Sequence, residues 1–371
     1  MKKTNNLAII GASYLQLPLI EKAKEMGYTT HVFAWAANDV GETAADFFYP
    51  ISITEVDQIT EKCREIGICG ICSIATDLGN YTVNYVANNL GLPGNSMECT
   101  RMSTNKYLMR KAFAMHADPS PRYLTVDEEM DLSTLELEYP IIVKPTDRSG
   151  SRGICKLESP KGMREAVKAA IDVSFEKKAL IEEFAEGQEY SVEGISYNGE
   201  HHILAMTQKY TTGAPSFIET GHLEPAPISE EIYQKAVKIV THALDTLKIK
   251  NSASHSEIKI DQKGNFKIIE IGSRMGGDAI GSDLVRYSTG VDYVRAVIQV
   301  ACGIEPDLNP VCETCSVETR FILTRDDLKE LRRIQNEEPE RILRIIDDKH
   351  FNLIGCTTDS SNRAGCYIVK V

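Results

Sequence analysis

The sequence lacks any uninterrupted apolar run of 18 residues, so no segment predicts a membrane-spanning helix. It also lacks an excess of basic residues. Its 371 residues include 41 Lys and Arg against 53 Asp and Glu, a formal net charge of −12. This balance argues against nucleic acid or an anionic membrane as a partner. Because Met1, Lys2 and Lys3 lead directly into strand-like residues without a signal-peptide pattern, we expect a cytoplasmic protein.

Two common nucleotide-binding fingerprints are also missing. No GxxxxGK[ST] phosphate loop occurs, and the turn at Gly11-Ala12-Ser13 lacks the GxGxxG spacing of dinucleotide-binding folds. A nicotinamide-dependent dehydrogenase built on the first lobe is therefore disfavoured. A nucleotide remains compatible with the acidic composition, since its site needs only a few local cations.

The sequence has ten cysteines, and the flanks of the Cys312/Cys315 pair lack the turn glycines of zinc knuckles. Cys69 and Cys72 lie inside an apolar run, where small buried thiols are common. Four further thiolates could in principle bind zinc, and these are Cys312, Cys315, Cys356 and Cys366. Without the flanking glycines, we expect reduced and unligated cysteines.

Strand and helix signals alternate over the first 95 or so residues. Strands are expected at 7–10, 30–34 and 68–75, with helices at 18–26 and 81–90. This alternation predicts a parallel sheet with crossover helices, an α/β unit. The turn-rich segment 91–96 is the expected end of this lobe.

The rest of the chain predicts an α+β arrangement. A helix over 99–116 leads into a small unit with strands at 139–144, 154–157 and 179–183, a helix at 162–173 and a mobile hairpin. Strands at 190–195 and 202–208, a helix at 230–247 and a hairpin of 254–260 with 266–271 follow, then helices at 325–335 and 339–348 and closing strands. We predict domains at 1–95, 96–310 (with a small mobile lobe at about 118–185) and 311–371.

The hairpin carries two glutamates that are expected to face each other. If Ile260 and Phe266 flank its loop, Glu257 lies opposite Ile269 or Glu270, with Cβ atoms about 5 Å apart when residues pair directly. Two like charges at that distance favour a cation between them. Magnesium fits, because it takes carboxylate and nucleotide phosphate oxygens together. Two solvated glutamates on an exposed strand are the alternative.

Other residues nearby suit anions and an adenine base. Arg274 follows the second glutamate by four residues and could grip a transferred phosphoryl group, while the glycines after it allow close backbone approach. Lys144 ends an apolar strand before the flexible loop 147–153, which is able to close over phosphates. The strand end at 180–184 could present backbone groups and carboxylates to an adenine and a ribose. Taken singly, each motif also fits an ordinary surface turn.

Taken in order, these motifs resemble the ATP-grasp superfamily, and within it the amino-acid ligases and the carbamoyl-phosphate-synthetase-like carboxylate–amine ligases. The likeness covers about 1–310 well and the tail weakly. It rests on Asn105-Lys106, Val143-Lys144-Pro145, Ser149 to Gly153, Ile181 to Phe184 with Gly187-x-Glu189, His255-Ser-Glu257, and Ile269 to Arg274. The resemblance implies an ATP-grasp fold behind an N-terminal Rossmann-like, pre-ATP-grasp domain.

The resemblance also implies roles for individual residues. Lys106 and Lys144 hold ATP phosphates, and Arg274 stabilises an acyl phosphate and the tetrahedral intermediate. Glu257 and Glu270 bind Mg²⁺, or Mn²⁺. The ATP site is completed by the covering loop, the adenine border and the ribose contact, namely Ser149, Gly150, Ser151, Gly153, Glu182, Glu183, Phe184, Ala185 and Glu189.

For the substrates, the resemblance implies that the stretch from 208–213 through 221–222 lines the acceptor or carboxylate pocket. The candidate substrate residues are Lys209, His222, His255, Arg274 and Gly277. A structural role is an equal alternative for both histidines. The family often has Asn two residues after the second metal glutamate, where this chain has Gly272, which leaves Ser273 or a water to replace that contact.

The implied reaction joins a small carboxylate, such as an amino acid, to an amine through an acyl phosphate, with ADP and phosphate released. A bicarbonate-dependent carboxylase or carbamoyl-phosphate-type reaction is the alternative within the enzyme class, although no biotin-carrier signal or glutaminase lobe is present. A non-catalytic ATP sensor is the alternative outside it. A homodimer is expected from the family alone.

Overall fold

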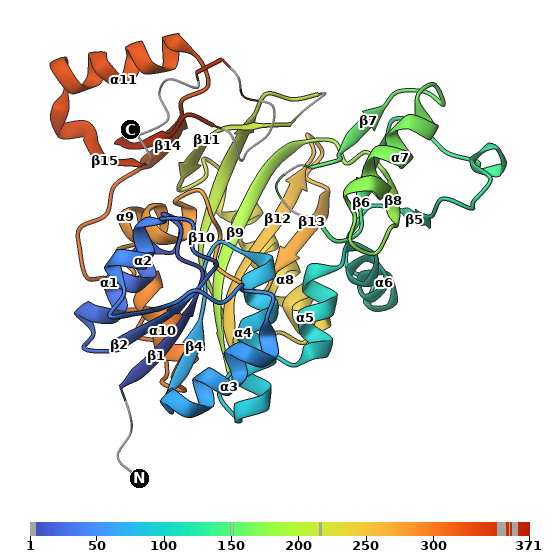
Figure 1. The fold of residues 1–371 in the computed structure, drawn as a ribbon. Helices are drawn as coiled ribbons and strands as arrows, with labels where there is room; N and C mark the ends of the chain where they lie inside the picture. Colours follow the sequence, from blue (N-terminus) through green and yellow to red (C-terminus); the bar gives the residue numbers. More distant parts are fainter. Residues whose placement is uncertain are drawn as a thin grey trace.

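The computed structural model describes residues 5–148, 150, 152–214, 217–346, 354–355, 357 and 363–371, and the strands within these residues form three sheets (Figure 1). The first sheet is parallel throughout, in the order β3-β2-β1-β4. Its strands are β1 (Asn6–Ile10), β2 (Thr29–Phe33), β3 (Phe47–Tyr49) and β4 (Gly70–Cys72). The predicted parallel α/β unit is confirmed.

Four helices accompany this sheet: α1 (Leu17–Glu25), α2 (Val40–Ala44), α3 (Val56–Ile66) and α4 (Asp77–Leu90). The strand predicted at 68–75 is shorter than expected, because Ala75 has a left-handed φ of 60° and turns the chain into α4. The Thr76 side chain then accepts a hydrogen bond from the Gly79 N–H and caps α4. The loops after β1, β2 and β4 consequently meet at the carboxyl edge of the sheet.

The single helix predicted over 99–116 is two helices, α5 (Met97–Thr104) and α6 (Lys106–His116). The break is at Asn105, whose backbone is extended and whose side chain accepts a hydrogen bond from the Leu108 N–H. This N-cap starts a new helix where the apolar periodicity alone suggested continuity. It also places Lys106 in the first turn of α6.

The second sheet forms the lobe on the right of Figure 1 and has the order β5-β8-β6-β7, with all pairs antiparallel. The core of this lobe consists of apolar residues from these strands and from one face of α7. The elements are β5 (Tyr123–Val126), a short 3₁₀ turn (Leu132–Thr134), β6 (Ile141–Pro145), β7 (Cys155–Leu157), α7 (Met163–Val173) and β8 (Ala179–Glu183).

The third sheet is antiparallel and extends through the centre of the molecule in the order β13-β12-β9-β10-β11-β14-β16-β15. Its strands are β9 (Gln188–Tyr197), β10 (Glu200–Thr211), β11 (Glu219–Glu224), β12 (Ser252–Ile260), β13 (Phe266–Gly272), β14 (Val317–Phe321), β15 (Ile342–Ile346) and β16 (Cys366–Lys370). The accompanying helices are α8 (Glu230–Thr246), a π turn (Ile280–Leu284), α9 (Val285–Thr289), α10 (Tyr293–Ala301) and α11 (Arg325–Glu337).

The helix predicted at 339–348 is wrong. The segment forms a 3₁₀ turn (Pro339–Arg341) and then strand β15, whose β-branched residues pair with β16. Residues 347–348 lie outside the described part of the chain. The tail therefore extends the central sheet, and α10 packs into the hydrophobic core of the first lobe. The domain limits at residues 95 and 310 stay a prediction.

None of the helices in the described residues has the length and apolar character that a bilayer crossing requires.

Gly187 allows β9 to begin directly against the end of β12. Its φ is +108°, and a Cβ there would lie 2.2 Å from the Ile260 carbonyl oxygen. We expect Gly187→Ala to lower the free energy of unfolding by about 3 kcal/mol or more, from left-handed strain and overpacking together. Gly199→Ala is the matched control, because Gly199 also has a left-handed φ, of +85°. The atom nearest to its added Cβ would be Lys250 Cγ at 3.9 Å, so backbone strain alone should cost about 1 kcal/mol. Urea unfolding of both variants measures the difference, and equal losses would contradict the steric argument.

Glu224 is a fully buried carboxyl group at the end of β11 that accepts hydrogen bonds from Ser288 and Thr207. Burial raises its pKa from 4.5 to about 7, against the effect of these bonds. Because the folded-state pKa is the higher one, this group's stabilisation is complete below pH 4.5 and is lost as the pH rises through 7. We expect the difference in unfolding free energy between wild type and Glu224→Gln to change by about 3 kcal/mol between pH 4.5 and pH 8. Urea titrations at both pH values test this, and a constant difference would contradict it.

Candidate nucleotide and ligation site

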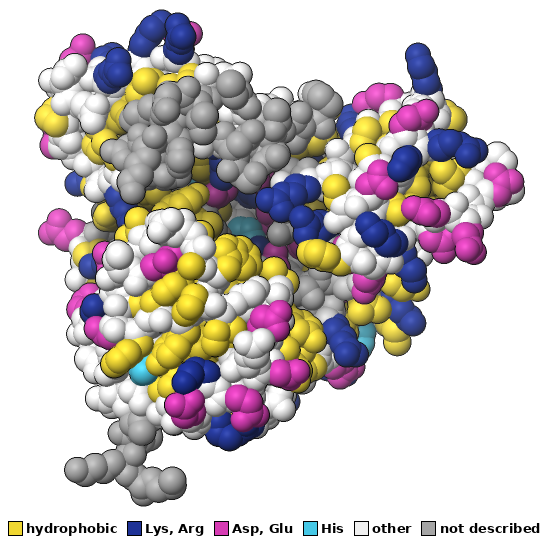
Figure 2. Space-filling model, in the orientation of Figure 1, with side chains coloured by type: hydrophobic (Ala, Val, Ile, Leu, Met, Phe, Trp, Pro, Cys, Tyr) yellow, Lys and Arg dark blue, Asp and Glu magenta, His cyan; other side chains and the backbone are white. Residues whose placement is uncertain are grey.

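The β12–β13 hairpin forms one wall of a cavity of about 190 Å³ between the second and third sheets, which we call the hairpin cavity. Glu257 pairs directly with Glu270, one of the two partners that the sequence left open, because the register shifts by one residue between Glu257 and Ile258. Most of the predicted site residues line this cavity: Lys106, Lys144, Gly150, Glu182, Glu183, Phe184, Ala185, Glu189, Lys209, His255, Glu257, Glu270 and Arg274. Figure 2 shows charged side chains of both signs in the recess beside the right-hand lobe.

Each of the facing glutamates forms an ion pair with a buried lysine. The Lys209 ammonium lies 2.5 Å from Glu257 and 3.1 Å from Glu189, and the Lys106 ammonium lies 2.9 Å from Glu270. Both glutamates keep about a quarter of their side chains exposed, so their oxygens face the cavity rather than the core. The hairpin therefore presents two carboxylates that attract cations.

These neighbours keep Glu257 ionised. Burial would raise its pKa, but Lys209 and His255 hold the pKa of Glu257 well below its usual value. Burial would likewise lower the pKa of Lys209, but Glu257 and Glu189 hold it well above its usual value. His255 lies 3.4 Å from Glu257 and 2.5 Å from the fully buried Glu193, and these carboxylates raise its pKa to about 9 despite burial.

Lys144 lies at the opposite side of the cavity on β6. Its ammonium group is 2.6 Å from Glu182, whose other oxygen is 2.6 Å from the fully buried Arg110. Burial lowers the pKa of Lys144, and the neighbouring cations Arg110 and Lys106 lower it further against the pull of Glu182. Both oxygens of the Glu182 carboxylate are thus paired with cations. Contacts to an adenine would therefore come from the backbone of β8 and not from this side chain.

An apolar slot in the same cavity suits a planar base. Ile142, Ile154, Phe217 and Ile269 contribute to its lining beside Phe184. The sequence predicted only Phe184 and Ala185 of this slot, because the other residues come from separate strands and loops.

Arg274 is held by a residue that the sequence prediction missed. Asp77, in the first turn of α4, accepts a hydrogen bond from the Arg274 Nε–H at 2.8 Å and lies 3.5 Å from its Nη2. A Cβ at Gly272 would lie 3.3 Å from both the Arg274 guanidinium carbon and an Asp77 oxygen. The missing side chain at Gly272 therefore makes room for this ion pair.

Ser273 does not replace the missing contact at Gly272. Its hydroxyl is buried and bonds the side chains of Asn80 (2.9 Å) and Ser103 (2.7 Å), away from the hairpin cavity. Of the two replacements considered from the sequence, Ser273 is therefore the wrong one.

Several predicted site residues lie elsewhere. Gly153 lies against Val173 of α7, outside the cavity lining. His222 is fully buried, 3.9 Å from Asp278, and Gly277 lines a different cavity. Ser149 and Ser151 lie outside the described residues, as does Cys356.

The sequence prediction missed four charged residues that line the hairpin cavity, which are Asp77, Arg148, Glu219 and Lys259. It also missed Arg110 and Glu193, which pair with Glu182 and His255 behind the lining. A signal existed for Asp77, since it follows the predicted strand 68–75 at the carboxyl edge of a parallel sheet. Arg110 and Glu193 lie inside a predicted helix and a predicted strand. No motif marked them.

The hairpin cavity fits a magnesium nucleotide by its chemistry. Its hard oxygen donors, Glu257 and Glu270, match a cation that takes one or two carboxylates and completes its shell with phosphates and water. Within the described residues, no group of three or more His, Cys, Asp or Glu residues is arranged to hold a metal alone. Such a cation would therefore need the phosphates as ligands, near Lys106 and Lys144.

Comparison with known families agrees with this geometry. Residues 137–283, which include β6 to β13 and the whole hairpin, match the ATP-grasp domain family. The chain has an ATP-grasp fold. The resemblance predicted from the sequence is confirmed, and so is the fold class.

Relatives with this fold include several ligases. The chain is 26% identical over 309 residues to alanine–anticapsin ligase of Bacillus subtilis, covering 73% of this chain and 64% of that protein. The chain thus spans less than two thirds of that relative. L-amino acid ligase from Bacillus licheniformis superposes with a TM-score of 0.82 at 24% identity, over 100% of this chain and 94% of that one. N5-carboxyaminoimidazole synthetase from Staphylococcus aureus, solved with ADP, has a TM-score of 0.78 at 16% identity, over 99% and 93%.

Proposed function

We propose that this chain uses ATP to activate a carboxylate as an acyl phosphate and joins it to an amine, releasing ADP and phosphate. The observation that carries the proposal is the pairing of Glu257 with Glu270 in a cavity that also holds Lys106, Lys144 and Arg274. The ligases among its relatives support the choice of an amino acid as the first acid to test.

The position of each residue in the cavity determines its role in the proposed reaction. Lys106 and Lys144 bind phosphate oxygens, and the apolar slot around Phe184 holds the base. Magnesium bound by Glu257 and Glu270 would neutralise negative charge on the phosphates. Arg274, oriented by Asp77, stabilises the oxygen charge that develops at the activated carboxyl group.

Two bond exchanges complete the reaction. A carboxylate oxygen attacks the γ-phosphorus, and the bond from that phosphorus to the ADP oxygen breaks. The amine nitrogen then attacks the acyl carbon and loses a proton, and phosphate leaves with the bonding electron pair. Neither step needs a covalent enzyme nucleophile.

The test is ADP and phosphate release over a matrix of acids and amines, with amino-acid pairs first. Release that requires one acid and one amine together is the expected result. Release that depends on bicarbonate would favour the carboxylase or carbamoyl-phosphate-type alternative. Saturable ATP binding without ADP release for any pair would favour a sensor.

A further inference from the structure

One buried carboxylate lies between two parts of the site that the proposed reaction uses. Glu193 on β9 is fully buried and pairs directly with His255 on β12, so both side chains project from the same face of the central sheet. Its Oε1 lies 2.5 Å from His255 Nδ1, which donates because a carboxylate only accepts. Its Oε2 accepts a hydrogen bond from the Gly276 N–H at 3.3 Å. The two oxygens of Glu193 therefore hold two different segments of the chain.

The first of these contacts leads to Glu257, the proposed magnesium ligand. His255 lies two residues before Glu257 on the same strand, and its Nε2 is 3.4 Å from Glu257 Oε1. The Lys209 ammonium contacts the same oxygen at 2.5 Å. Since both donors hold Oε1, the other oxygen of Glu257 can face a cation. Carboxylate ligands of metals are commonly oriented by hydrogen bonds from such outer partners.

The second contact of Glu193 leads to the segment that carries Arg274. Gly276 follows Arg274 by two residues. A Cβ at Gly276 would lie 2.7 Å from His255 Nδ1 and 3.0 Å from Glu193 Oε2. The missing side chain thus lets the backbone approach the carboxylate–histidine pair closely enough to donate to it.

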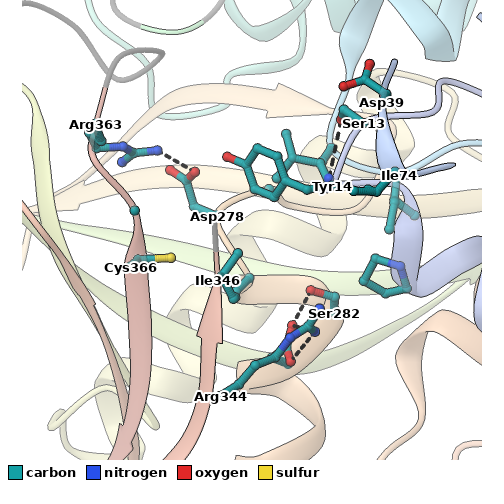
Figure 3. A pocket seen from close by; sticks show the side chains of 18 of the residues that line it. Ser13, Tyr14, Asp39, Ile74, Asp278, Ser282, Arg344, Ile346, Arg363 and Cys366 are labelled. Carbon is teal, nitrogen blue, oxygen red and sulfur yellow. Dashed lines mark hydrogen bonds and ion pairs between the residues drawn. The ribbon is translucent and has the colours of Figure 1, made fainter. Parts of the chain in front are cut away.

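The segment from Arg274 to Asp278 also separates two cavities. Arg274 lines the hairpin cavity, whereas residues 276–279 line a cavity of about 620 Å³ between the first lobe and the end of the central sheet, which we call the interlobe cavity. Arg363 fixes the far end of the segment, because it lies 2.5 Å from Asp278 (Figure 3). Glu193 holds the middle of the segment against the central sheet.

We propose that Glu193 is a positioning residue for the ligation site. Through His255 it orients Glu257 toward magnesium, and through the Gly276 N–H it fixes the backbone that carries Arg274. This role rests on the proposed ligase function and adds to it a residue that touches neither substrate nor cation. A buried ion pair often contributes little net stability, because desolvation offsets the attraction of its charges. Orientation of the two functional groups accounts for the contacts of both Glu193 oxygens.

The first experiment measures ADP binding by calorimetry, with magnesium and with EDTA in its place. For wild type, magnesium should tighten ADP binding. Glu193→Ala should reduce this magnesium-dependent gain by a factor of about 10 to 100, as is typical when the outer partner of a metal ligand is lost. The affinity for ADP in EDTA should stay unchanged, because the apolar slot and the phosphate-binding lysines are intact. A purely structural role would lower both affinities together.

Gly276→Ala tests the same pair without removing a charge. Its added methyl group would lie against both His255 and Glu193, so the magnesium-dependent gain should fall as in Glu193→Ala. Asp118→Ala is the matched control, since Asp118 is another buried carboxylate that contacts a histidine, His242 at 2.7 Å, outside both cavity linings. It should leave both affinities for ADP unchanged, and an equal loss in Asp118→Ala would overturn the positioning role.

A double-mutant cycle shows whether Glu193 acts through His255. The combined variant of Glu193→Ala and His255→Ala should lose no more magnesium-dependent affinity than the more affected single variant, and additive losses would overturn this connection. The connection to Arg274 is tested by turnover at saturating magnesium. There Glu193→Ala should have a roughly tenfold lower kcat with an unchanged KM for ATP. A wild-type kcat would overturn the second connection.

The outcomes separate this inference from the proposed function. If acid and amine together drive ADP release but Glu193→Ala keeps the magnesium-dependent gain and the wild-type kcat, the positioning role is wrong and the ligase proposal stands. If no pair drives ADP release but the gain depends on Glu193, the connection to Glu257 stands and the ligase proposal fails. If magnesium does not tighten ADP binding to wild type, the metal role of Glu257 and this inference are both wrong.

Discussion

Replacing Glu270 by alanine should lower acid- and amine-dependent ADP release by a factor of about 10² to 10³. Glu270 is one of the two hairpin carboxylates that line the cavity, and its loss also leaves the buried ammonium of Lys106 without its carboxylate. Glu270→Gln separates these effects, because it keeps a hydrogen-bond acceptor for Lys106 but loses the charge. We expect Glu270→Gln to be nearly as inactive as Glu270→Ala.

Steady-state rates at several magnesium concentrations measure the effect, and both variants should require more magnesium than wild type. Glu186→Ala is the matched control, since this exposed glutamate lies outside the hairpin cavity lining. Thermal unfolding of each variant shows whether any loss of rate reflects loss of fold. Full turnover by a folded Glu270→Ala would exclude the hairpin as the catalytic site.

Arg274→Met should lower kcat by a similar factor of about 10² to 10³, because in the proposed reaction its guanidinium stabilises the charge that develops at the acyl group. Arg274→Lys should recover little of this rate, since an ammonium group cannot reproduce the fork that pairs with Asp77. Asp77→Asn should have a smaller effect, roughly tenfold, because it weakens the orientation of Arg274 without removing it. The KM for ATP should change little in all three.

Gly272→Asn tests the same ion pair sterically. It introduces the residue that the ATP-grasp resemblance implies at this position, but its Cβ would lie 3.3 Å from the Arg274 guanidinium and from Asp77. We expect lower kcat from displacement of the pair. Asp57→Asn, on the surface of α3, is the control for Asp77→Asn. Unchanged kcat in both Asp77→Asn and Gly272→Asn would show that the pair does not position Arg274 for catalysis.

Local sequence patterns were sufficient to predict structure wherever the signal lies within one strand, helix or turn. The hairpin loop between β12 and β13 pairs Ile260 with Phe266, because the turn fixes which residues face each other. That register alone would place Glu257 opposite Ile269, and a register shift between Glu257 and Ile258 brings it opposite Glu270. Strand–helix alternation predicted the parallel sheet, because each helix connects one parallel strand to the next. Patterns failed at Asn105 and at 339–348, where a side-chain cap and the pairing of β15 with β16 overrode local periodicity.

The motifs around the hairpin, in their order along the chain, were enough to predict the ATP-grasp fold, since each motif is a short continuous stretch of sequence. The sequence could not reveal how those motifs are held in place. Asp77 is 197 residues from Arg274, and Glu182 pairs with Lys144 across two strands of another sheet. The interlobe cavity, formed by loops of the first lobe and strands of the tail, was likewise invisible. Only the tertiary structure decides such contacts, because they depend on how sheets pack and not on the spacing of residues within any one element.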